Sequence, residues 1–112
     1  MIQMESLEQL LIQCAKSRTD ISYSEALIAV GRRFTRPKMR ELCRVLSGIE
    51  ERSRRNGEPE LAVLVVRGSD RMPGDGWWAG RTNYRGEWTG EQAEKYVRRL
   101  QRKAFKYWAN CS

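Results

Sequence analysis

The sequence predicts a mainly helical α+β fold, with three N-terminal helices, a β-hairpin and a long C-terminal helix in one domain, residues 1–112. Two features support this prediction. Apolar residues recur at helical spacing in four segments, each preceded by a serine or threonine suited to capping. Between the third and fourth segments, residues 61–66 form an unbroken apolar run that is followed by turn-forming residues.

The first two helices are expected at 6–17 and 23–30. Ser6 and Ser22 each begin an S/T-x-x-E/Q pattern, in which the hydroxyl caps a free amide and the later side chain reaches back. Gly31 is a suitable stop for the second helix.

A third helix is expected to begin after Thr35, with Pro37 in its first turn, where a missing N–H costs nothing. It ends at the Asn-Gly pair at 56–57. The last helix, about 90–109, follows a third capping pattern that begins at Thr89. A short helix, a turn and a longer basic helix match a helix-turn-helix in outline, although many bundles that bind nothing share this order.

A strand is expected at 61–67 and a return strand at about 76–80. The residues between them, including Pro73-Gly74-Asp75-Gly76, have the composition of a tight turn. This pattern predicts a β-hairpin. Trp77 and Trp78 would then point to opposite faces, one buried and the other free to anchor a partner, unless the last helix covers both.

The formal net charge of +7 is unevenly placed: residues 31–56 carry +6 and residues 85–112 carry +4. Clustered positive charge is typical of proteins with a polyanionic partner, although a solvated surface is the simpler alternative. We therefore expect a non-enzymatic protein that binds nucleic acid, with double-stranded DNA favoured over RNA. The expected binding residues lie in the turn before the third helix, on that helix and at the hairpin tip: Arg32, Arg33, Arg36, Lys38, Arg40, Arg44, Arg67 and Arg71.

A second basic patch is expected on the last helix, at Arg98, Arg99, Arg102 and Lys103. These side chains could equally shield a packing helix with their stems. The alternative function is a protein-interaction module, in which the basic charge matches an acidic host protein and Trp77 or Trp78 supplies the anchor.

Other chemistries find little support in the sequence. There is no histidine and no CxxC pair, so zinc-finger patterns and histidine-based catalysis are excluded, and neither a metal nor a cofactor is expected. Cys14 and Cys43 are expected to be buried on helices, with Cys111 at a frayed end. Asp70, Asp75 and Glu87 could form a metal-nuclease cluster, but turn chemistry explains both aspartates. With no apolar run near 20 residues and no signal-peptide pattern, we expect a cytoplasmic protein without a membrane span.

The central motif resembles that of a small family of uncharacterised bacterial and phage proteins, which have an L-x-x-L-V-V strand followed by P-G-x-G and two aromatics. Here these are residues 61–66, 73–76 and 77–78; Tyr23-Ser24-Glu25-Ala26-Leu27 and Trp108 also fit. The resemblance covers about residues 20–108 and implies no function. The order of the elements is similar to that of winged-helix domains, which mostly bind DNA, with the hairpin as the wing.

Overall fold

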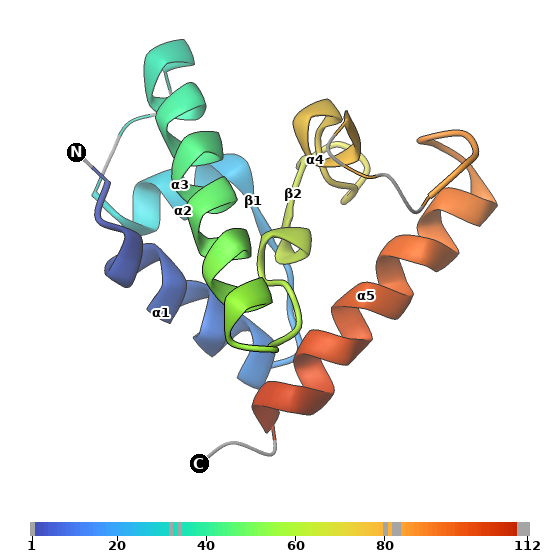
Figure 1. Cartoon of the computed structure of the whole chain (residues 1–112). Helices are drawn as coiled ribbons and strands as arrows, with labels where there is room; N and C mark the ends of the chain where they lie inside the picture. The colour runs from blue at the N-terminus through green and yellow to red at the C-terminus, as the bar shows by residue number, and fades with distance from the viewer. Residues whose placement is uncertain (1, 32, 34, 80, 82–83, 110–112) are drawn as a thin grey trace.

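The computed structural model describes residues 2–31, 33, 35–79, 81 and 84–109 (Figure 1). The described part of the chain is α+β and mostly helical, as predicted. Its elements in chain order are α1 (Met4–Lys16), β1 (Ile21–Ser22), α2 (Tyr23–Ala29), α3 (Arg36–Arg55), the 3-10 helix η1 (Ala62–Leu64), β2 (Val65–Val66), α4 (Asp75–Ala79) and α5 (Glu91–Ala109).

The apolar run at 61–66 lies at the centre of the fold, and every residue in it is buried. It passes between α3 on one side and α5 on the other (Figure 1). Only Val65–Val66 is extended, and it pairs in parallel with Ile21–Ser22. The predicted strand is therefore shorter than expected, because the Leu64 amide bonds to the Leu61 carbonyl and closes a 3-10 turn.

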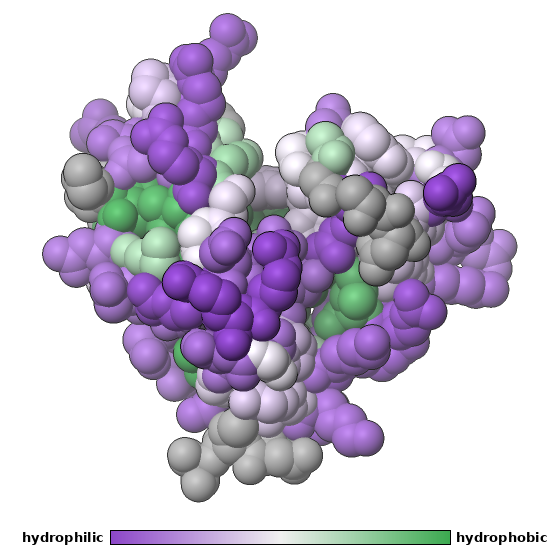
Figure 2. Space-filling view, viewed as in Figure 1, coloured by the Kyte–Doolittle hydropathy of each residue, from purple (hydrophilic) through white to green (hydrophobic). Residues whose placement is uncertain are grey.

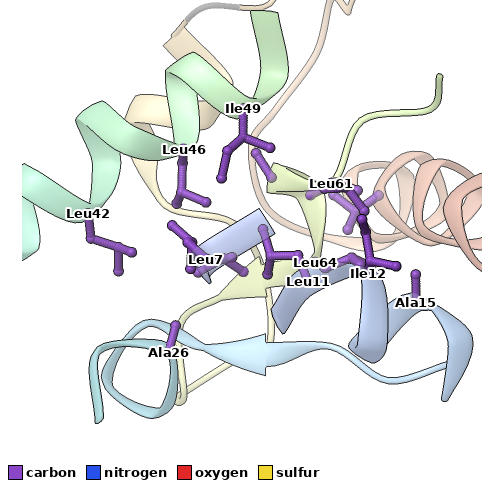
Figure 3. Close-up of a cluster of buried hydrophobic side chains, with 14 of the residues drawn as sticks. Leu7, Leu11, Ile12, Ala15, Ala26, Leu42, Leu46, Ile49, Leu61 and Leu64 are labelled. Carbon is purple, nitrogen blue, oxygen red and sulfur yellow. The ribbon is translucent and has the colours of Figure 1, made fainter. Parts of the chain in front are cut away.

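The core forms where three helices cover this central run. Leu7 and Leu11 of α1 and Leu42 and Ile49 of α3 have no exposed surface, and they converge on the run (Figure 3). Val97 of α5 covers it from the other side. Burial of a leucine or isoleucine side chain stabilises a fold by roughly 1.5–3 kcal/mol, so this cluster holds the helices together.

Two of the predicted helix caps are present. The Ser22 hydroxyl accepts the Glu25 amide at 3.1 Å, and the Glu25 carboxylate accepts the Ser22 amide at 2.9 Å, which completes a capping box. The Thr35 hydroxyl accepts the Lys38 amide at the start of α3. The cap predicted at Ser6 is wrong, because α1 begins earlier, at Met4, and Ser6 lies within its first turn.

The predicted β-hairpin is also wrong. The segment expected as its return strand is the short helix α4, and the described residues contain only the two-stranded parallel pair. Successive helical side chains point about 100° apart. Trp78 therefore turns into the core, at 2% exposure, while Trp77 remains half-buried at its edge. Burial of the Trp78 indole outweighs the poor helix propensity of Gly76 and the aromatics.

Candidate nucleic-acid interface

Three predicted arginines of α3 form one exposed row. Arg36, Arg40 and Arg44 are spaced by four residues, so they lie along one side of the helix, away from the buried face that carries Leu42 and Leu46. Among the residues that the structure describes, none of the three makes an ion pair. The N-terminal turns of α3, which carry them, project beyond the other elements (Figure 1). The three guanidinium groups are therefore available to a ligand.

The charge at this end of α3 is opposite to what helix stability favours. The N-terminus of a helix carries a partial positive charge and prefers acidic side chains. The first turn of α3 has none, and Arg36, Lys38 and Arg40 lie in its first two turns. Seven basic and three acidic side chains give α3 a net charge of +4. The Thr35 cap and the Lys38–Glu41 ion pair offset part of this cost, but no acidic side chain lies in the first turn.

Lys38 is less available than its neighbours. Its ammonium group lies 3.3 Å from the Glu41 carboxylate, which also accepts the backbone amide of Ile2 at 2.5 Å. The Ile2 hydrogen bond and Lys38 together lower the pKa of Glu41. Arg33 is exposed, and Arg32 lies outside the described residues.

Arg67 and Arg71, expected at a hairpin tip, make ion pairs within the protein. Arg67 contacts Asp70 at 3.1 Å and Asp75 at 3.7 Å. Arg71 contacts Asp20 at 2.5 Å, and this hydrogen bond raises the pKa of Arg71. These pairs connect the 67–75 loop to the segment before α2 and to the start of α4. Both arginines therefore have a structural role, and the hairpin tip that would present them is absent from the described residues.

A groove of about 420 Å³ separates α3 from α4. It appears as a notch between two lobes of the surface (Figure 2). Cys43, Ser47 and Glu50 line it from α3, and Trp77 lines it from α4.

Cys43 is exposed in this groove, so its expected burial is wrong: it lies at the edge of the apolar stripe of α3 rather than within it. Partial burial in the groove nevertheless raises the pKa of its thiol. Cys14 is half-buried, and Cys111 lies outside the described residues.

Glu50 and Trp77, which line the groove, also belong to an ionic cluster that the sequence did not predict. One Arg81 nitrogen contacts both Glu50, at 3.1 Å, and Glu60. The Arg81 guanidinium also lies 3.8 Å from the Trp77 ring centroid, and the Trp77 indole N–H donates to Glu60 at 2.9 Å. Burial and the neighbouring Glu60 raise the pKa of Glu50. These contacts hold the Trp77 side chain in place, and its indole N–H already has an acceptor in Glu60.

The four basic residues expected to form a patch on α5 differ in their exposure. Arg98 points inward and donates to the Arg71 carbonyl at 3.2 Å and to Gln101 at 2.9 Å. Arg99, Arg102 and Lys103 are exposed, as a binding patch requires. Of the two tryptophans proposed as anchors, Trp78 is buried and only Trp77 reaches the groove.

Two of the carboxylates considered for a metal site already have a cationic partner. Asp70 and Asp75 both pair with Arg67, and the described residues contain no group of three or more potential metal ligands. Among the described helices, none has the length and apolar character needed to cross a bilayer.

Comparisons with protein-family models, curated proteins and solved structures give no match for this chain. The family resemblance drawn from the central motif stays a prediction. The candidate interface therefore depends on the geometry and charge of α3.

Proposed function

We propose that this protein binds double-stranded DNA through the exposed arginine row of α3, Arg36, Arg40 and Arg44. The observation that carries the proposal is that these side chains form one exposed row and have no ion-pair partner among the described residues. The row begins at the N-terminus of α3, where the helix dipole disfavours the charge of Arg36. Arginine side chains can contact both phosphate oxygens and guanine edges in the major groove.

The order of α2, turn and α3 supports a helix-turn-helix mode of docking. In that mode, the first turns of the second helix enter the major groove, while flanking cations hold phosphates. The N-terminal turns of α3 carry the arginines and project from the body of the protein (Figure 1). In this proposal, Arg33, which is exposed before α3, would be a flanking phosphate contact. Docking in this mode does not require a hairpin wing.

A salt titration tests the proposal. Fluorescence anisotropy of a labelled duplex is measured at several salt concentrations from about 50 mM upward for the wild type and for R40Q/R44Q. Each lost phosphate contact lowers the slope of log K against log salt by about 0.9, so the double variant loses about 1.8. Absence of wild-type binding at about 50 mM salt would refute the proposal.

A second double variant, K16Q/R18Q, is the matched control. Lys16 and Arg18 are exposed at the C-terminal end of α1, away from the N-terminal end of α3, and neither makes an ion pair with a described residue (Figure 1). This control removes the same net charge as R40Q/R44Q. An equal loss of affinity in both variants would mean that overall charge, rather than α3, attracts DNA.

A further inference from the structure

A second basic surface lies at the other end of the molecule, where residues 84–87 pack over the first turns of α5. It is a hollow of about 710 Å³. Its lining contains two tyrosines and one glutamine, Tyr84, Tyr96 and Gln92. The remaining lining residues are all cationic: Arg85, Lys95, Arg99 and Arg102. No carboxylate is among the lining residues, so the hollow itself carries a charge of +4.

The cations follow one side of α5. Lys95, Arg99 and Arg102 are spaced by four and three residues, which places them in a line about 10 Å long at 1.5 Å per residue. Lys95 pairs with Glu91 at 3.1 Å, but both side chains are more than three-quarters exposed. Such a pair is worth little and yields readily to a phosphate.

The two tyrosines form a fixed aromatic floor. Their ring centroids are 4.5 Å apart with an interplanar angle of 36°, and both rings are only half-buried. Tyr84 also packs against the buried Trp78 at 5.1 Å, and its hydroxyl donates to the Glu87 carbonyl at 2.7 Å. The Arg99 guanidinium lies over the Tyr96 ring, 5.4 Å from its centroid. Rings held in this way are positioned before any ligand arrives.

We propose that this hollow binds single-stranded nucleic acid, with a base against the tyrosine floor and phosphates on Lys95, Arg99 and Arg102. Aromatic rings beside a row of cations are the combination that single strands require, because their unpaired bases expose a stackable face. Duplex bases are already stacked and cannot reach the rings. In contrast, α3 contains no aromatic residue, so the two surfaces have different ligands. This inference goes beyond the duplex-binding proposal and does not depend on it.

The experiment compares two probes and two surfaces. Anisotropy is measured with a labelled oligothymidine and with a labelled duplex, for the wild type, R99Q/R102Q and R40Q/R44Q. We expect R99Q/R102Q to weaken oligothymidine binding and to lower its salt slope by about 1.4, while duplex binding is largely kept. We expect R40Q/R44Q to weaken duplex binding and to leave oligothymidine binding largely unchanged. If R99Q/R102Q leaves oligothymidine binding unchanged, or weakens both probes equally, the proposal is refuted. An unchanged duplex affinity in R40Q/R44Q contradicts only the α3 proposal.

A second pair of variants isolates the aromatic floor. Y84L removes the ring, whereas Y84F keeps the ring and removes only the hydroxyl that bonds to Glu87. Loss of one base-stacking contact lowers affinity by about tenfold, so Y84L is expected to bind oligothymidine about tenfold more weakly than Y84F. Circular dichroism establishes that both variants are folded, and if Y84L unfolds, R99Q/R102Q still decides the question. Equal affinities for folded Y84L and Y84F would overturn the stacking role.

Discussion

Replacement of Arg81 by glutamine removes the cation of the partly buried ionic cluster while leaving two carboxylates in place. Arg81, Glu60 and Glu50 have side chains that are 12%, 17% and 28% exposed, so solvent screens them only in part. Removal of one partner from a buried ion pair costs about 3–5 kcal/mol. Because Glu50 retains some contact with water, we expect a loss near the lower bound, about 3 kcal/mol in the free energy of unfolding.

The measurement is urea unfolding followed by circular dichroism, with R81Q and the triple variant R81Q/E50Q/E60Q studied side by side. The triple variant no longer has the two unpaired carboxylates, so it is expected to recover more than half of the lost stability. A loss for R81Q below about 1 kcal/mol would refute the reasoning, since it would place the cluster among ordinary exposed ion pairs.

The pH dependence provides an independent check. Burial and Glu60 already raise the pKa of Glu50 in the folded protein. A carboxyl with a raised folded pKa binds its proton more readily in the folded state, so stability is gained as the pH falls through that pKa. Removal of Arg81 raises the pKa of Glu50 further. The loss in free energy of unfolding of R81Q relative to the wild type is therefore expected to be largest at neutral pH and smaller in mild acid. A loss that does not change with pH would contradict this expectation.

Three further outcomes are expected. S22A removes half of the capping box at the start of α2 and is expected to cost about 1 kcal/mol in urea unfolding, whereas S22T, which keeps the hydroxyl, costs less. G57A places a side chain at a φ of +68° with no atom within 4 Å of the new Cβ, so its cost is backbone strain alone, about 1–2 kcal/mol, and a neutral result would contradict that assignment. R36E supplies the missing acid in the first turn of α3 and is expected to raise the free energy of unfolding by about 0.5–1 kcal/mol while weakening duplex binding; if thermal melts show a loss of stability, the helix-dipole argument fails.

Local patterns predicted α1, α2, α3 and α5. The cap at Ser22 and the apolar stripe that includes Leu42, Leu46 and Ile49 both depend on residues within a few positions of one another. The burial of 61–66 follows from its composition, because six consecutive apolar residues are poorly suited to a solvent-exposed segment. The exposure of Arg36, Arg40 and Arg44 follows from the same helical period.

The errors occurred where distant segments decide the structure. Residues 65–66 pair with 21–22, and no turn pattern signals a parallel pairing between segments separated by α2, α3 and η1. The Asp75-Gly76-Trp77-Trp78 segment has the composition of a hairpin, but burial of Trp78 makes it helical. The partners of Arg81, Glu50 and Glu60, likewise come from separate segments. Nothing at residue 81 in the sequence indicates which carboxylates will face it.

The central position of 61–66 has a consequence for the order in which this chain can fold. On a ribosome, α1, α2 and α3 emerge before residues 61–66, so the leucines that face this run are not yet covered by it. That apolar surface is covered only after the central run arrives, and the run itself is enclosed only after α5 packs against α1. Because these contacts are distant in sequence, folding is expected to be late and cooperative rather than helix by helix. A nascent chain that has not yet released α5 is thus the form most exposed to aggregation.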